Sequence, residues 1–182
     1  MTRAIVTPAV LAPAALAEVK QWLGITTARD DAPLTALLRS GLDICEAFTG
    51  TMPLSCVCEE VLPAVPDWQV LGTRPVQAIT AVSALAPDNG RTLLAAAAYA
   101  VELEADGSGK VLVMEPGEAQ RLVVRFTAGI APDWTSLPEA MRQGLVRLAA
   151  HQHREREGSG AAPLPPASVA ALWRPWRRMR LA

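Results

Sequence analysis

The chain has 182 residues, of which 51% are hydrophobic and only 4% aromatic, and its formal net charge is -1 at neutral pH. This length suits one domain with an appendage, and its core must be built mainly from alanine, valine and leucine. The near-neutral charge argues against a protein whose whole surface binds nucleic acid or anionic lipid. The longest apolar run, around residues 93–101, is too short to cross a membrane, so no membrane partner is expected.

The cysteine count and the N-terminus bear on the cellular compartment. Cys45, Cys56 and Cys58 are an odd number of cysteines in a chain too large to need disulfides, which predicts a reducing cytoplasm. Residues 4–17 loosely resemble a signal peptide, but Arg3 is the only basic residue beside them and two prolines interrupt them. We therefore expect no secretion.

Local signals predict two N-terminal helices. The first covers residues 13–24, with Pro13 in its first turn and Gly24 placed to end it. The second covers residues 31–49, and the preceding Asp30 offers an N-cap and a charge that suits the helix dipole.

A third helix is predicted near the C-terminus, over residues 137–156. Ser136 and Glu139 at its start are spaced as a capping box. The Gly/Pro/Ala-rich residues 158–166 cannot continue this helix and are expected to form a linker. Residues 167–182 then form a C-terminal docking tail.

Between these helices, residues 54–129 change from helical to alternating hydrophobicity and contain two turn signals, which predicts antiparallel hairpins. Residues 1–157 are thus expected to form a single α+β domain. In it, the N-terminal helices and a long C-terminal helix form a helical bundle with an inserted antiparallel β-hairpin region and a C-terminal extension. The expected strands cover residues 55–62, 76–85, 99–104, 110–114 and 121–127.

The polar and sulfur-containing side chains have simpler explanations than catalysis. Cys56 and Cys58 would point to one face of a strand, which suits a soft metal or redox chemistry, but no second Cys/His cluster follows at zinc-finger spacing, so buried small hydrophobes are the stronger interpretation. His151 and His153 would point about 200° apart on a helix and indicate a solvated helix end. The acidic pair Glu59-Glu60 indicates an exposed strand.

No nucleophile elbow, phosphate-binding glycine loop or dinucleotide fingerprint occurs in the sequence. We therefore expect no enzyme, no catalytic residue, no metal and no cofactor.

The C-terminal tail is the least ordinary segment, because it combines two tryptophans with four arginines and no acid. Tryptophan and arginine are the residues most often found at interface hot spots. Two other interpretations stay open: the tail folds back over the domain, with its tryptophans covering the core, or it contacts phosphate and stacks on bases as a small DNA-binding module. The candidate partner-binding residues are Trp173, Arg174, Trp176, Arg177, Arg178 and Arg180.

The order of motifs resembles the head-tail connector (adaptor, head completion) family of long-tailed phages and of phage-derived gene transfer agents. The likeness covers almost the whole chain, and no single motif is specific by itself. Its residues are Val19-Lys20-x-Trp22-Leu23-Gly24, Asp30-Asp31-x-x-Leu34, Glu46-x-Phe48-Thr49-Gly50, Arg74-Pro75-Val76-Gln77-x-Ile79, Val124-x-Phe126-Thr127-Ala128-Gly129, Leu137-Pro138-Glu139-Ala140, the charged segment His151 to Glu157, and Leu164-Pro165-Pro166 before Leu172 and the arginine-rich end.

The resemblance implies a structural subunit of a dodecameric ring that copies of the chain form between a portal protein and a stopper or tail-completion protein. DNA would pass through the lumen of the ring without sequence-specific contact. The subunit would be made in the bacterial cytoplasm and end in the neck of the phage-like particle. The resemblance also makes the Trp/Arg tail the portal-facing anchor.

Overall fold

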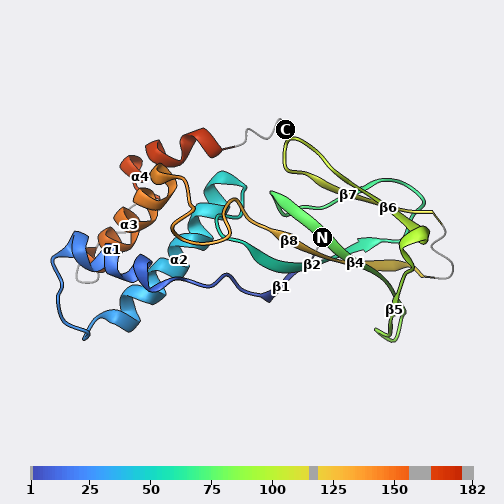
Figure 1. The fold of residues 1–182 in the computed structure, drawn as a ribbon, viewed down its shortest axis with the longest axis horizontal. Coiled ribbons are helices and arrows are strands. Elements are labelled where there is room, and N and C mark those ends of the chain that lie inside the picture. The colour runs from blue at the N-terminus through green and yellow to red at the C-terminus, as the bar shows by residue number, and fades with distance from the viewer. Residues whose placement is uncertain (1, 115–118, 156–164, 178–182) are drawn as a thin grey trace. The chain divides into compact units, whose positions relative to one another are not determined.

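The computed structural model describes residues 2–114, 119–155 and 165–177. The chain divides into two compact units. One, here called the β unit, consists of Met1–Ala9 and Ser55–Gly129, and the other, the helical unit, consists of Val10–Leu54 and Ile130–Ala182. Figure 1 shows the strands gathered in the first and the helices in the second.

The β unit contains two antiparallel sheets. A five-stranded sheet has the order β1-β2-β8-β4-β5, and a three-stranded sheet has the order β3-β7-β6. The strands are β1 (Thr2–Thr7), β2 (Cys56–Pro63), β3 (Gln69–Val70), β4 (Val76–Leu85), β5 (Arg91–Leu93), β6 (Tyr99–Leu103), β7 (Gly109–Val113) and β8 (Arg121–Ala128).

Strand β8 is the centre of the larger sheet, because it pairs with β2 on one side and with β4 on the other. Its residues Leu122, Val124 and Phe126 are buried, as are Cys58 and Leu62 on β2. These side chains lie on one face of the sheet because direct partners in a ladder share a face. We call this the inner face, and it forms the core of the β unit.

A buried carboxylate joins the inner face to the segment after β3. Glu60 is only 2% exposed, and its two oxygens accept hydrogen bonds from the backbone N–H groups of Gly72 and Thr73, each at 2.8 Å, and from the Thr73 hydroxyl at 2.6 Å. A buried charge is tolerated when its lone pairs are satisfied in this way. The prediction of strand exposure for Glu60 is therefore wrong, whereas Glu59 is partly exposed and pairs with Arg91 at 2.8 Å.

Within its described residues, the helical unit contains four α-helices: α1 (Pro13–Leu23), α2 (Asp31–Thr49), α3 (Glu139–Arg154) and α4 (Ala167–Trp173). Helix α3 contacts the other three. Gly24 and Gly50 end α1 and α2 in the left-handed conformation, with φ of 72° and 73°, as expected for C-terminal glycines. The buried side chains of this unit include Val19, Leu34, Leu38, Cys45, Met141, Leu145, Leu148, Val169 and Trp173.

The start of α3 differs from the predicted capping box. The N-cap is Pro138, which makes no side-chain cap. The Asp133 carboxylate instead accepts hydrogen bonds from the Thr135 hydroxyl at 2.8 Å and from the Ser136 N–H at 2.9 Å, and these bonds lower the pKa of Asp133. The Asp133 carboxylate thus organises the approach to the helix.

The predicted architecture is wrong. A bundle of N-terminal helices and a long C-terminal helix with an inserted β-hairpin region was expected, but the structure is a sheet-rich α+β fold with short helices and two antiparallel sheets. Helix α3 has 16 residues, and β1, β3 and β5 were not predicted as strands. β1 and β3 pair with strands distant in sequence, β2 and β7, which local periodicity cannot show. β5 has only three residues, too few to show an alternation.

The predicted division into a domain over 1–157, a linker over 158–166 and a tail over 167–182 stays a prediction. Residues 158–164 of that linker lie outside the described part of the chain.

We expect Glu60→Gln to lower the free energy of unfolding by about 1–3 kcal/mol, because an amide nitrogen would face donors that now meet a carboxylate oxygen. Urea unfolding followed by circular dichroism measures this loss. Glu102→Gln on β6 is the control, because Glu102 is exposed and its replacement should change stability by less than about 0.5 kcal/mol. Equal effects of the two variants would contradict the role given to Glu60.

Candidate functional site

The C-terminal segment begins with a tryptophan that is part of the core. Trp173, the last residue of α4, is 0% exposed. Its indole N–H donates a hydrogen bond to the Met141 carbonyl oxygen on α3 at 3.2 Å, and its ring lies 6.2 Å from that of Phe48 on α2, measured between centroids. This side chain therefore anchors α4 to both neighbouring helices.

Gly144 on α3 makes room for this indole. A Cβ atom at position 144 would lie 2.1 Å from the indole nitrogen of Trp173 and 2.7 Å from the adjacent ring carbon. No real pair of atoms tolerates such distances, so only glycine allows this packing. Glycine inside a helix is about 1 kcal/mol less favourable than alanine. Position 144 has glycine nevertheless, because the indole occupies the space of a side chain.

The chain turns outward directly after Trp173. A 3-10 helix, η3 (Arg174–Trp176), follows α4; Arg174 is exposed, and Trp176 is partly exposed. Arg177 is also exposed, with its guanidinium carbon 5.2 Å from the centroid of the Phe48 ring, a cation–π arrangement. The aromatic pair of Phe48 and Trp173 thus orients the first exposed residues of the tail.

The six predicted partner-binding residues have different surroundings in the structure. Trp173 lies inside the helical unit, in the manner of the alternative in which the tail covers the core. Arg174, Trp176 and Arg177 lie at the surface close to one another in sequence. Arg178 and Arg180 lie outside the described residues.

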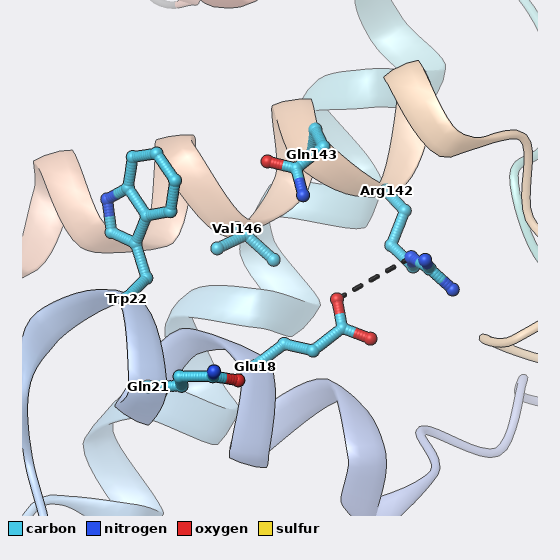
Figure 2. A pocket seen from close by; sticks show the side chains of 6 residues that line it. All are labelled: Glu18, Gln21, Trp22, Arg142, Gln143 and Val146. Carbon is cyan, nitrogen blue, oxygen red and sulfur yellow. Dashed lines mark ion pairs between the residues drawn. The ribbon is translucent and has the colours of Figure 1, made fainter.

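A second surface feature, which the sequence analysis did not identify, is an open hollow between α1 and α3. Figure 2 shows its lining: Glu18, Gln21 and Trp22 from α1 face Arg142, Gln143 and Val146 from α3. The sequence predicted no role for Trp22 beyond its place in a motif that the chain shares with the connector family. Contact between two helices far apart in sequence creates the hollow, and no local pattern reports it.

A polar network lies at the edge of this hollow. Glu18 accepts a hydrogen bond from the buried indole N–H of Trp134 at 3.1 Å and lies 3.5 Å from Nε of Arg142. The guanidinium carbon of Arg147 on α3 lies 5.5 Å from the centroid of the Trp22 ring. Trp22 is nevertheless 46% exposed, which makes it a candidate contact residue.

The cysteine pair of β2 is oriented as predicted. Cys56 and Cys58 are buried on one face, with their sulfurs 3.5 Å apart. Among the described residues, no group of three or more His, Cys, Asp or Glu side chains could hold a metal ion.

Burial raises the pKa of the third thiol, Cys45 on α2, to about 12. A thiol with so high a pKa stays protonated and unreactive at neutral pH.

The histidines lie at the end of α3, and both are partly exposed. Nε2 of His151 is 3.1 Å from a carboxylate oxygen of Glu155, one turn further along. This contact lies at the helix end that was predicted to be solvated. In the described part of the chain, no helix is long and apolar enough to cross a membrane.

Comparison with known proteins gives one consistent group of relatives. No protein-family model and no curated protein sequence matches the chain. Three solved structures match all of it and 98% of their own chain: the neck of an empty gene transfer agent particle computed with C6 symmetry (26% identity, TM-score 0.79), the virion of a native gene transfer agent particle (26%, 0.78) and the neck of a native particle computed with C12 symmetry (27%, 0.74). The resemblance predicted from the sequence is thereby confirmed.

We expect Gly144→Ala to destabilise the protein by about 1–3 kcal/mol, because the new methyl group must displace the Trp173 indole. Gly41→Ala on α2 is the matched control, because its Cβ would lie at an ordinary 3.5 Å from the Leu145 side chain and should add up to about 1 kcal/mol of helix stability. Urea unfolding measures both effects, and acrylamide quenching of tryptophan fluorescence reports the exposed indole. A Gly144→Ala variant that is as stable as the unmodified protein and shows no quenching beyond that of the already exposed Trp22 and Trp68 would contradict this packing.

The raised pKa of Cys45 predicts slow chemistry with thiol reagents. The folded state keeps the proton that the unfolded chain loses near its ordinary pKa of 9.0, so stability falls as pH rises from about 9 towards 12. At pH 8 we expect Cys45 to react with a disulfide reagent only after unfolding. Mass spectrometry of the labelled protein, with and without urea, identifies the modified cysteine. Rapid labelling of Cys45 in the folded protein would show that burial does not control this thiol.

Proposed function

We propose that this chain is a structural head-tail adaptor in the neck of a phage-like particle. In this proposal, copies of the chain form a dodecameric ring between a portal protein and a stopper or tail-completion protein, and DNA passes through the lumen without sequence-specific contact. The chain is made in the bacterial cytoplasm and then joins the virion neck. No catalytic step is assigned to it.

The observation that carries the proposal is the likeness to gene transfer agent necks, which extends over the full length of both chains. A likeness over 98–100% of each chain covers the β unit and the helical unit together. The C6 and C12 symmetries of those necks support a ring of copies, which requires a heterologous interface between neighbours.

The portal anchor in this proposal is the C-terminal segment. Arg174, Trp176 and Arg177 supply exposed guanidinium groups and an amphipathic ring, a composition common at interface hot spots. Arg178 and Arg180 extend the same basic segment in sequence. Trp173 contributes by positioning this segment, since its indole is buried against α3.

Removing the entire tail would test this proposal poorly, because Val169 and Trp173 are core residues and their loss would expose part of α3. A sharper variant replaces the arginines at positions 174, 177, 178 and 180 by alanine and keeps α4. We expect at least about a tenfold loss of incorporation into particles, equivalent to more than 1.4 kcal/mol of binding. Immunoblots of purified particles and electron microscopy of their necks measure it.

The matched control replaces Arg29 and Arg39, which are also exposed, by alanine and should be incorporated normally. Normal incorporation of the tail variant would refute the anchor. Absence of the unmodified protein from particle necks would refute the adaptor function itself. Strong DNA binding that weakens steeply with salt and depends on these arginines would favour a DNA-binding module instead.

A further inference from the structure

The two sheets of the β unit pack together through their inner faces. On β7, Gly109, Val111 and Val113 are buried, and they share one face of the three-stranded sheet because alternate residues of a strand do so. A Cβ atom at position 109 would lie 2.9 Å from the side chain of Val76 on β4, and Val76 is opposite the buried Ala128 on the inner face of the larger sheet. Each sheet therefore has an outer face, turned away from this core, and the two outer faces point in opposite directions.

Three arginines lie on the outer face of the five-stranded sheet. Arg121 and Arg125 alternate with the inner-face residues of β8. Arg91 of β5 is on the same face, because it and Arg121 both have Leu85 of β4 as a direct partner. The five strands place one acid on this face, Glu59, which is opposite Arg125. Three cations and one anion give the strand residues of this face a net charge of +2.

The arginines are more accessible than this glutamate. One carboxylate oxygen of Glu59 lies 2.8 Å from a guanidinium nitrogen of Arg91, and the other lies 3.9 Å from one of Arg125. The Glu59 side chain is 13% exposed, whereas those of the two arginines are 55% and 46% exposed. Leu93, two residues after Arg91 and so on the same face, is 69% exposed. A partner that approaches this face meets guanidinium groups and an aliphatic side chain.

The outer face of the three-stranded sheet combines charged and aliphatic side chains. Lys110 and Leu112 alternate with the buried residues of β7. The direct partners of Lys110 are Glu102 on β6 and Val70 on β3, so all four side chains lie on the outer face. Glu102 and Val70 are exposed.

Carboxylates outnumber cations on this second face. Glu104, directly after β6, forms an ion pair with Lys110. The hydrogen bond to Glu104 raises the pKa of Lys110 above its ordinary value, and the carboxylates of Glu102 and Asp106 add to this effect. Asp106 is itself paired with Arg74 at 3.1 Å. Glu102 and Glu104 against Lys110 leave a net charge of -1 on the face.

The two outer faces complement each other. One is basic and the other acidic, and each exposes an aliphatic side chain, Leu93 on the first and Val70 on the second. Contact between two like faces would bring charges of one sign together, which opposes the pairing of identical surfaces. Because the faces point in opposite directions, a contact between unlike faces leaves one face of each kind free for a further copy. Such a heterologous contact builds a ring when its rotation closes.

We propose that the outer face of the five-stranded sheet of one copy packs on the outer face of the three-stranded sheet of the next copy, which links the β units head to tail. Facing sheets pack about 10 Å apart, a distance over which arginine and glutamate side chains meet. This inference rests on the proposed adaptor function, and it names the surfaces through which the copies form the ring.

Exchange of charge between the two faces tests this contact. The basic-face variant carries Arg121→Glu and Arg125→Gln, which change the net charge of that face from +2 to -1. The acidic-face variant carries Glu102→Lys and Glu104→Gln, which change the other face from -1 to +2. Each variant then has two faces of like charge, so we expect at least about a tenfold loss of incorporation into particles. Immunoblots of purified particles measure it against the unmodified protein.

Combination of the two variants distinguishes this contact from other causes of a loss. A chain with all four substitutions again has one basic and one acidic face, so we expect its incorporation to return to within about threefold of the unmodified level. Co-expression of the two single-face variants should also restore incorporation, because unlike variants fit one another in alternation. A loss through misfolding, or through broken binding of DNA or another protein to one face, would not be restored in either case.

The control carries Arg29→Glu and Arg39→Gln, which make the same change of charge at exposed positions of the helical unit and should be incorporated normally. Normal incorporation of either single-face variant, or no recovery with all four substitutions, would overturn the contact and leave the adaptor function intact. A loss in the control as large as in the single-face variants would overturn the assignment to the sheet faces. Absence of the unmodified protein from particles would overturn both proposals.

Discussion

The packing of Trp173 against Gly144 is the constraint on which the helical unit and its C-terminal segment depend. The indole occupies the place of a missing side chain on α3 and donates to the Met141 carbonyl at 3.2 Å. This contact holds α4 on the unit and brings Arg177 over the Phe48 ring. The basic tail therefore starts from a determined position, because the residue before its first arginine is buried.

The two units carry different kinds of surface. The helical unit presents an arginine-rich segment and a hollow walled by Trp22, in which polar groups fix geometry and aromatic rings supply contact area. The β unit presents half-covered aliphatic side chains, such as Ile5 on β1 and Val101 on β6, at the ends of its two sheets.

Much of the local structure was predictable because short-range physics controls it. Pro13 begins α1 and left-handed Gly24 follows its last residue, since proline and glycine restrict the backbone at these positions. In β8, Leu122, Val124 and Phe126 fall on one face by simple alternation, and all three are buried. The predicted capping box between Ser136 and Glu139 does not form. The Ser136 N–H group donates instead to the carboxylate of Asp133, three residues earlier.

The sequence by itself determined where most elements lie, that Cys56 and Cys58 share a face, and which family the chain resembles. Only the tertiary structure decided that the architecture is sheet-rich, that Glu60 is buried, and that Trp173 belongs to the core. The physical reason is that these outcomes depend on partners distant in the chain: β1 on β2, Glu60 on the backbone of Thr73, and Trp173 on the space at Gly144. Periodicity and capping report only a residue's near neighbours, whereas burial depends on which distant segment covers it.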